Sequence, residues 1–568
     1  SDLKLIYEFG EARVDNQSII EYLQIRQNFS YWWMTLLVEK CNYSKSPQIN
    51  NIIKLMALEK WVDENNYKKI QIVTSNNELA DAVSLLSKKL LIDFKWKKIN
   101  KENNSSFSIK KIFYLIPNFI QQPIWLLRYL VINWPLKGVG VKQWRESSAT
   151  TTFVSYFLNI IPEKLKQGEY GSRYWTDMVG VLNKKQYAAN WLHHYIKSDL
   201  LPTAKKAREA IQTFNCQKDS RQTHATLASF LTIPLIFHTL KDYYSILKLK
   251  KSVCKVLQSK SGYLWPLLKK DCQESMGGNT AISMLLNFNL FERAMSELPV
   301  QKRGCYLLEN QGWEFGFISA WKSAGHKRNL LGFPHTTIAY WDLRFFFDSR
   351  SYRRKKQGGL PLPDYVGVNG ERAKQMYLDG GYPENELIEV ESLRFLYLSY
   401  FSAHNNAIDD KGLKNKVVLV VGDYLSQNTA KQLKLLSLAM NNLESLIHFI
   451  IKPHPSCPIK MRDVSGLNCE ISTQPIGELL LMSDIVYSSL ATAAAVDAYC
   501  AGKPVITIFD GKNLNVSPLR GVSGVHFVSN AKELAIAINE VEVDELEQRE
   551  DYFYLDVELP RWKEWLIG

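Results

Sequence analysis

A short polar stretch, KPHP, has the residue types and spacing to bind an anion. Lys452 and His454 alternate with two prolines directly after an apolar run at residues 446–451. Proline fixes its own φ and restrains the residue before it, so both side chains are held in extended geometry. A cation and an imidazole ordered in this way predict an anion site. The alternative is a surface turn with a solvated lysine and histidine.

Two further polar turns follow apolar runs of the same kind. Gly422 and Asp423 end the run at residues 416–424, and Ser488 and Ser489 end the run at 484–489. We predict a helix directly after the serines, and its N-terminal amides and dipole would favour an anion. An isolated serine pair is more often a plain N-cap. Together with KPHP, however, the turns predict a phosphate pocket.

The elements that would position these turns alternate regularly along the C-terminal part of the chain. Strands are predicted at residues 416–424, 446–452, 468–473, 484–489, 503–509 and 524–529. Helices are predicted at residues 428–443, 476–483, 490–502 and 531–541. This alternation predicts a doubly wound parallel sheet, in which ligands bind beyond the carboxyl ends of the strands.

The same strand–helix pattern occurs upstream, over residues 301–395. Strands are predicted at 304–310, 328–337 (strand plus loop), 365–370 and 386–392, with helices at 311–325 and 371–381. Further strands are expected at 3–9, 68–75, 150–158 and 225–233. The predicted fold is α/β: two Rossmann-type doubly wound parallel-sheet domains facing a cleft. The predicted parts are residues 1–395, residues 396–545 and a tail (546–568) packing back toward the hinge.

Composition narrows the class of partner. The 568 residues include 70 Lys and Arg against 57 Asp and Glu, a net charge of +13. This balance suits nucleic acid, an anionic membrane or phosphorylated substrates, but no nucleic-acid-binding signature is present. The 8 cysteines form no CxxC pair, which indicates reduced thiols and a cytoplasmic setting. The N-terminal sequence indicates a first strand rather than a signal peptide.

Residues 112–136 are apolar and aromatic and are flanked by Lys110, Lys111 and Lys137. Prolines, amides and Arg128 interrupt the segment, so it is a poor bilayer span. Its composition suits an interfacial helix or hairpin on an anionic membrane surface; two ordinary core helices are the alternative. We therefore expect a cytoplasmic protein, peripheral on the inner face of the membrane if the first interpretation holds.

Two Rossmann-like domains with an HP motif and a double-serine motif in the second resemble the GT-B bacterial sialyltransferases and Kdo transferases. Three blocks resemble more closely the bacterial surface carbohydrate biosynthesis proteins: residues 333–348, 368–398, and KPHP with the run 487–506. The resemblance covers residues 300–545 well and the N-terminal half loosely. It implies a GT-B-like fold in which residues 1–395 form the acceptor-side domain and residues 396–545 the donor-binding domain. It implies a glycosyltransferase that moves a sialic, pseudaminic, legionaminic or Kdo sugar from its CMP donor to an oligosaccharide or lipid-linked acceptor in capsule or surface polysaccharide synthesis.

The resemblance also implies roles for individual residues. His454 would contact the CMP phosphate beside Lys452, and Ser488 and Ser489 would hold the phosphate or the sugar carboxylate. Because CMP leaves as a phosphate dianion, preorganised cations and amides are the chemistry that this step needs. No DxD motif is evident, so no metal and no cofactor are expected.

A positioned carboxylate must act on the acceptor hydroxyl. The family's acidic motif has an approximate match in Glu309 to Gly312, where Asn310 replaces the second acid. Glu309 is therefore the predicted base, and Gly312 would let a sugar approach the backbone closely. Glu314 is the second candidate, or a surface charge on the predicted helix.

Four further residues are candidates with open alternatives. His335 would bind the acceptor or the donor carboxylate, or be hydrogen-bonded within its loop. Asp342 and Arg344 are predicted as an ion pair at the cleft rim. Glu478 would accept from the ribose hydroxyls, or lie exposed on its helix. The alternative functions are a UDP-sugar transferase or 2-epimerase, and a catalytically degenerate capsule-assembly scaffold.

Overall fold

The computed structural model describes residues 2–40, 48–99, 118–217, 220–353, 358–404, 416–443, 447–455, 457–464, 467–511, 514–541 and 552–567. The chain forms two compact units. Unit 1 comprises Ser1–Phe333, Leu343–Val366 and Gly380–Glu386, and unit 2 comprises Pro334–Asp342, Gly367–Asp379 and Leu387–Gly568. The unit boundaries do not coincide with the predicted division at residue 395, since residues 387–395 belong to unit 2.

Unit 2 contains a six-stranded sheet in the order β16-β15-β14-β17-β18-β19. Its pairings are all parallel. The chain starts at β14, winds outward through β15 and β16, and returns beside β14 as β17, so the strand order reverses between β14 and β17. This is the doubly wound order 3-2-1-4-5-6 of Rossmann sheets and confirms the predicted fold class. The strands are β14 (Lys416–Val421), β15 (Ile447–Lys452), β16 (Cys469–Ile471), β17 (Ile485–Ser488), β18 (Val505–Ile508) and β19 (Val525–Val528).

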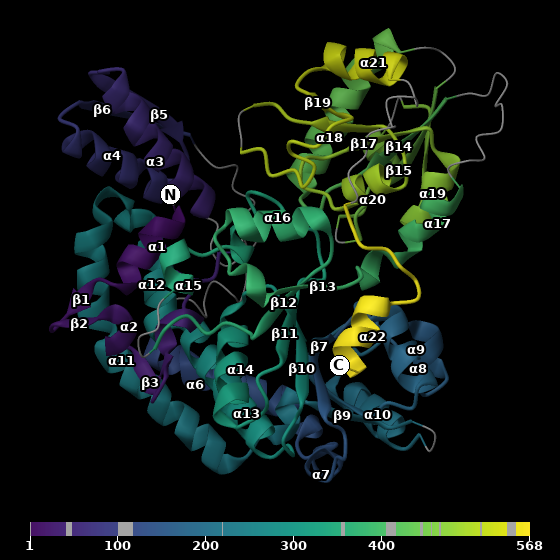
Figure 1. The fold of residues 1–568 in the computed structure, drawn as a ribbon. Helices are drawn as coiled ribbons and strands as arrows, with labels where there is room; N and C mark the ends of the chain where they lie inside the picture. The colour runs from purple at the N-terminus through teal and green to yellow at the C-terminus, as the bar shows by residue number, and fades with distance from the viewer. Residues whose placement is uncertain are drawn as a thin grey trace. The chain divides into compact units, whose positions relative to one another are not determined.

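The apolar run of β14 is buried on both faces, as a central parallel strand requires. Val418 and Val420 pack into one apolar cluster, which includes residues of α18 and α21. Leu419 and Val421 pack into the other, which includes residues of α20. The strand is therefore covered on both sides (Figure 1). The helices of unit 2 are α16 (Glu371–Asp379), α17 (Ser399–His404), α18 (Ser426–Ala439), α19 (Ile476–Met482), α20 (Ala494–Cys500), α21 (Ala531–Glu540) and α22 (Pro560–Ile567).

A seven-stranded sheet runs in the order β13-β12-β11-β10-β7-β8-β9. Its pairings from β12 to β9 are parallel. The chain winds outward from β7 to β9 and returns beside β7 as β10, so this order reverses between β7 and β10. The second doubly wound sheet is thereby confirmed. Its strands are β7 (Thr151–Phe157), β8 (Ala189–Tyr195), β9 (Gln222–Thr226), β10 (Arg303–Leu307), β11 (Leu330–Phe333), β12 (Tyr365–Val368) and β13 (Leu387–Glu389).

The rest of unit 1 consists of helices and three two-stranded sheets. The small sheets pair β1 (Arg13–Val14) with β2 (Gln17–Ser18), β3 (Gln24–Arg26) with β4 (Phe29–Ser30), and β5 (Lys69–Thr74) with β6 (Asp93–Lys98). The helices are α1 (Asp2–Gly10), α2 (Ile19–Tyr22), α3 (Ile49–Glu64), α4 (Asn77–Lys89), α6 (Asn118–Asn133), α7 (Val141–Arg145), α8 (Pro162–Lys166), α9 (Thr176–Lys184), α10 (Ala204–Asn215), α11 (Ile233–Ser261), α12 (Trp265–Gly277), α13 (Asn279–Ser296), α14 (Gly312–Ser323) and α15 (Ser349–Tyr352). The cysteines within the described ranges are free thiols.

Two predicted strands of unit 1 were wrong in whole or in part. Residues 3–9 form helix α1, because Ile6, Phe9 and Gly10 are buried at helical spacing on one face. The run 225–233 leaves the sheet after Thr226, where a capping box between Thr226 and Ser229 starts a 3₁₀ turn. Short apolar runs do not distinguish strand from helix by periodicity alone.

Three histidines pack without charge in unit 1: His193 and His224 are buried, and His194 is half-buried. His193 Nε2 and His224 Nδ1 lie 3.1 Å apart with their rings stacked. Burial lowers the pKa of His224 to about 3, and likewise that of His194 to about 3. Since an unfolded histidine titrates near pH 6.5, the unfolded chain binds protons that the folded chain excludes. Stability therefore falls as pH drops from about 6.5 toward 3.

We expect His194→Phe to weaken this acid sensitivity. The His194 ring packs 4.3 Å from the Trp313 ring, so phenylalanine keeps the packing and removes one titrating group. Between pH 6.5 and 5.0 the variant should lose about 1.5 kcal/mol less unfolding free energy than wild type. Thermal midpoints measured at both pH values check this. Equal acid shifts in the two proteins would contradict it.

Candidate functional site

The three polar turns of unit 2 meet at the point where its strand order reverses. Val421, the last residue of β14, pairs with Lys452 of β15 on one side and Ser488 of β17 on the other. The turns therefore leave the sheet at one level, and the Gly422 N–H donates to the Lys452 carbonyl at 3.0 Å. Figure 1 shows β14, β15 and β17 side by side. We predicted that the KPHP turn and the serine pair lie at neighbouring strand ends of one sheet, and the strand register confirms this.

Asp423 holds two of these turns together. Its side chain is fully buried and accepts from the Leu425 N–H at 2.9 Å and from Asn428 Nδ2 at 3.0 Å. Ser489 Oγ donates to Asp423 Oδ2 at 2.7 Å. Asp423 is thus a positioning residue for the Ser489 turn, a role that the sequence did not indicate.

Ser488 is also fully buried, and its Oγ lies 2.8 Å from Thr507 Oγ1 on β18. The prediction that a helix begins directly after the serines is wrong, because α20 starts at Ala494. Thr492 accepts the N–H of Ala494 and of Ala495 before the first helical turn. The hydroxyls of Ser488 and Ser489 thus have partners within unit 2, Thr507 and Asp423. Residues 490–493 separate the two serines from the first residue of α20.

Lys452 and His454 remain half-buried at the same edge of the sheet. Burial lowers the pKa of Lys452, whose Nζ donates to the Gln474 carbonyl. Burial also lowers the pKa of His454, and the Asp423 carboxylate acts in the opposite direction. The exposed Tyr424 ring lies 6.3 Å from the His454 ring. Tyr424 was missed at the sequence level, although an aromatic residue directly after Gly-Asp was a usable signal.

In unit 1, Glu309 lies just beyond β10, beside β7, where that sheet's strand order reverses. Its side chain is 18% exposed, with Arg344 Nη1 at 3.4 Å and Gln311 Nε2 at 2.5 Å. Tyr156, near the end of β7, is half-buried, and desolvation and then the Glu309 charge raise the pKa of Tyr156. Glu309 is a largely buried carboxylate that a guanidinium and an amide hold in one orientation.

Glu314 is not the surface charge that the sequence allowed. It is fully buried, and its carboxylate accepts the backbone N–H of Glu309 at 3.1 Å, of Asn310 at 2.9 Å and of Gln311 at 3.2 Å. Burial and the Glu309 charge raise the pKa of Glu314, while these donors act in the opposite direction. Glu314 therefore builds the turn that presents Glu309.

Asn310 has φ of +52° and donates from Nδ2 to the Arg344 carbonyl at 2.7 Å. Asparagine is among the few residues that adopt this left-handed conformation readily. The Asn310 side chain thus ties the turn to the segment that carries Arg344, which is a structural reason for asparagine where an acid was expected.

Gly312 is needed for a reason other than the predicted one. A Cβ there would lie 3.0 Å from the Met34 carbonyl oxygen, and the Gly312 N–H donates to Glu39 Oε2 at 3.2 Å. The backbone that approaches Gly312 closely is therefore the chain's own, so the prediction that this glycine admits a sugar is wrong.

We expect Glu314→Ala to destabilise the protein strongly. Three buried donors lose their acceptor, at roughly 1 to 3 kcal/mol each. The exposed Glu163 on α8 is a matched control, and Glu163→Ala should leave the thermal midpoint unchanged. Thermal unfolding of both variants checks the prediction. A thermal midpoint of Glu314→Ala that lies within about 1 °C of the wild-type midpoint would contradict the prediction.

The other predicted residues fall in separate places. His335 is buried in unit 2, in a loop that Asn369 Nδ2 holds through the carbonyls of Pro334 and Thr336, both at 3.3 Å. Asp342 belongs to unit 2 and Arg344 to unit 1, so their ion pair stays a prediction. Glu478 lies exposed on α19.

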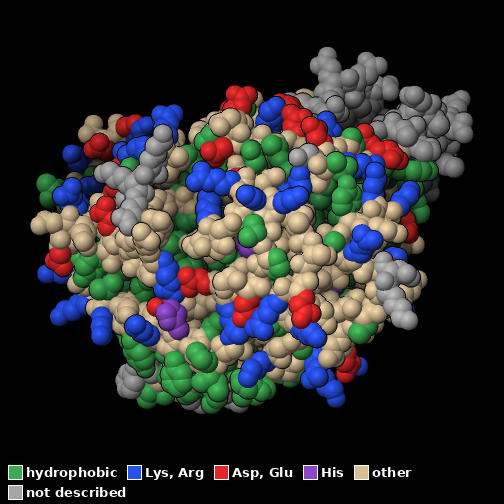
Figure 2. All heavy atoms as spheres, turned by 60° about the horizontal axis from the view of Figure 1, so that its bottom comes forward, with side chains coloured by type: hydrophobic (Ala, Val, Ile, Leu, Met, Phe, Trp, Pro, Cys, Tyr) green, Lys and Arg blue, Asp and Glu red, His purple; other side chains and the backbone are tan. Residues whose placement is uncertain are grey.

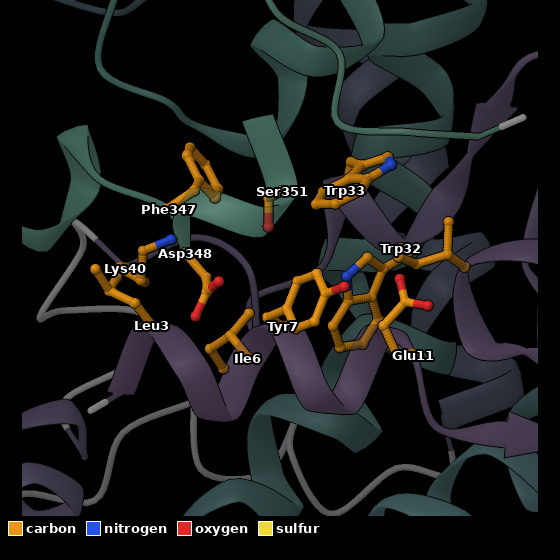
Figure 3. A pocket seen from close by; sticks show the side chains of 11 residues that line it. Leu3, Ile6, Tyr7, Glu11, Trp32, Trp33, Lys40, Phe347, Asp348 and Ser351 are labelled. Atoms are coloured by element: carbon orange, nitrogen blue, oxygen red, sulfur yellow. The ribbon is translucent and has the colours of Figure 1, made fainter. Parts of the chain in front are cut away.

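A small cavity in unit 1 lies between α1, the Trp32–Trp33 segment and the chain around Asp348 (Figure 3). Its volume is about 10 Å³, room for about one water molecule. Lys40 points into this region, and its Nζ lies 3.9 Å from the centre of the Phe347 ring. The cavity is a packing feature, too small for a sugar. Among the residues whose placement is described, no cluster of three His, Cys, Asp or Glu could hold a metal ion.

No family model and no curated protein matches the chain. Several solved structures are similar at low identity. UDP-GlcNAc 2-epimerase from Methanocaldococcus jannaschii has a TM-score of 0.37 and 10% identity, over 71% of this chain and 95% of that one. UDP-GlcNAc 2-epimerase from Neisseria meningitidis, bound to UDP-GlcNAc, has a TM-score of 0.39 and 12% identity, over 73% of this chain and 99% of that one. α,α-Trehalose 6-phosphate synthase from Burkholderia multivorans has a TM-score of 0.38 and 13% identity, over 70% of this chain and 92% of that one. These scores are too low to carry an argument about function.

Proposed function

We propose that the protein is a GT-B-type glycosyltransferase that transfers an acidic nonulosonic or Kdo sugar from its CMP donor to a surface-glycan acceptor. One observation carries the proposal. Lys452 and His454 in one doubly wound sheet and Glu309 in the other follow the carboxyl ends of strands at or next to the reversal of the strand order, which is where such sheets bind their ligands. The six-stranded sheet offers Lys452 and His454, the cations that a nucleotide phosphate needs. The seven-stranded sheet offers the oriented carboxylate of Glu309.

The donor site is proposed at Lys452 and His454. Both groups are half-buried at the strand ends, so they act where water screens charge less than in bulk. As the bond from the sugar to the CMP phosphate breaks, negative charge grows on the phosphate oxygens. The ammonium and the imidazolium stabilise that charge. The exposed ring of Tyr424 offers a surface on which a pyrimidine base can stack.

The base is proposed as Glu309, which takes the proton from the acceptor hydroxyl as that oxygen attacks the sugar. Arg344 and Gln311 fix the carboxylate, and Glu314 fixes the turn behind it. The reaction as proposed uses no metal and no cofactor, since the charge that develops on the phosphate is met by side-chain cations.

Calorimetry with CMP and with UDP tests the donor. We expect CMP to bind and UDP to bind more weakly. Binding of UDP without CMP would replace the proposal by a UDP-sugar transferase or 2-epimerase. CMP binding without turnover on any glycan acceptor would replace it by a degenerate assembly scaffold.

The pH dependence of CMP binding should report His454. Its pKa is lowered in the free protein, so at neutral pH the ring is mostly uncharged, and a bound phosphate favours the protonated form. The ratio of wild-type to His454→Gln affinity should therefore rise as pH falls from 7.5 to 5.5 (roughly the range in which an imidazole titrates). Titration of the CMP phosphate itself cancels in this ratio. A ratio independent of pH would remove His454 from the site.

A further inference from the structure

Helix α6 turns its apolar side chains outward. Ile120, Ile124, Leu127 and Val131 follow one another at helical spacing and are all exposed, Leu127 by 63% and Val131 by 68%. Ile132 of α6 and Trp134 of the adjoining 3₁₀ turn (Trp134–Leu136) extend the exposed set. Side chains at this spacing form one stripe along a helix.

The buried side of α6 includes three amides. Gln121, Gln122 and Asn133 are buried together with Leu126. An ordinary surface helix buries its apolar stripe and exposes its amides, so α6 is inverted relative to that pattern. An exposed apolar stripe of this kind marks a surface that another apolar phase covers.

The charge around the stripe has one sign. Residues 118–145 contain no Asp and no Glu, whereas Arg128, Lys137 and Lys142 are exposed there. Lys137 Nζ lies 4.4 Å from the centre of the half-exposed Trp134 ring. An apolar stripe with cations beside it and an amphipathic ring at its end is the composition of an interfacial helix.

Figure 2 shows apolar side chains gathered at the lower edge of the view, with lysine and arginine side chains above them. A second copy of the chain is a poor occupant of the α6 stripe, because a two-fold contact would bring the cations of both copies together. An anionic surface complements the stripe and the cations at the same time.

We propose that the exposed face of α6 docks on the surface of an anionic lipid bilayer. Leu127, Val131 and their neighbours enter the boundary between headgroups and acyl chains, while Arg128, Lys137 and Lys142 contact the lipid headgroups. The helix lies on the membrane, and no helix within the described ranges is long and apolar enough to cross one. The proposal stands apart from the donor and acceptor chemistry proposed above.

Co-sedimentation tests the proposal with the full chain and vesicles of phosphatidylcholine containing phosphatidylglycerol. We expect the wild type to sediment with these vesicles, less with pure phosphatidylcholine, and less as salt rises. The double variant Leu127→Asp/Val131→Asp should lose at least ten-fold (about) in binding, since two aspartates enter the apolar and anionic phase. The matched control is Leu438→Asp, which changes a similarly exposed leucine on α18 of unit 2 and should bind like wild type.

Thermal midpoints and CMP binding of the double variant show whether it is folded. A folded double variant that binds vesicles like wild type overturns the proposal. A wild type that stays in the supernatant at low salt overturns it too. If sedimentation velocity instead shows a wild-type dimer that the double variant abolishes, without vesicle binding, the stripe is a self-association surface and the proposal is wrong.

Discussion

Replacing Glu309 by glutamine should lower kcat by on the order of 10²-fold or more while CMP affinity stays unchanged. The amide keeps the size of the side chain and its contacts with Gln311, but it cannot take a proton from the acceptor hydroxyl. Because the side chain is largely buried and held between Arg344 and Gln311, no exposed carboxylate on another loop can take its place. Steady-state turnover and calorimetry on one preparation measure both quantities.

Two other glutamates of unit 1, Glu163 and Glu314, provide the controls for this experiment. Glu163→Gln removes an exposed charge from unit 1 and should keep full turnover. Glu314→Gln should lower the thermal midpoint, because an NH₂ group replaces part of an acceptor that three backbone N–H groups share. If Glu309→Gln turns over normally and Glu314→Gln, though folded, does not, the base has been misassigned. A reaction that retains anomeric configuration would also exclude a simple base.

The double variant Lys452→Ala/His454→Ala should weaken CMP binding by about 100-fold. Each side chain offers a charge-assisted hydrogen bond to the phosphate, worth roughly 1.5 kcal/mol or more, and about 2.7 kcal/mol in total corresponds to that factor. Both residues extend from strand ends at the reversal of a parallel sheet, so their loss leaves the apolar core of unit 2 in place. Calorimetry at about pH 6.5 to 7, close to the unperturbed pKa of histidine, gives the CMP affinities of the variant and of the wild type.

Lys532→Ala is the matched control for loss of a cation from unit 2. Lys532 is exposed on α21, away from the three polar turns in sequence, and its removal should change CMP affinity by less than two-fold (about). A Ser488→Ala/Ser489→Ala variant should lose less affinity than the cation variant, since both hydroxyls already have partners in Thr507 and Asp423. Unchanged CMP affinity in the cation variant would remove KPHP from the proposed donor site.

The sequence by itself determined the strands of the six-stranded sheet, most strands of the seven-stranded sheet, and the positions of the polar turns. It did not indicate β8, and it indicated β9 only in its last two residues. A buried parallel strand is a continuous apolar run, and the polar residue that ends it also ends the strand, as at Val421 and Gly422. Such local signals need no distant partner. They failed where a short apolar run suited two elements, as in α1, and where turn residues precede a helix, as before Ala494.

Only the tertiary structure decided what each polar side chain does. Ser489 bonds to Asp423, 66 positions away, and Glu309 pairs with Arg344, 35 positions away. Glu314 resembles a surface residue in the sequence and is buried because the backbone of the preceding turn folds over it. The stripe of α6 resembles a core face in the sequence and is exposed, whereas Gln121, Gln122 and Asn133 of the same helix are buried. Periodicity tells which residues share a face of an element, whereas the packing of the whole unit decides which face is covered.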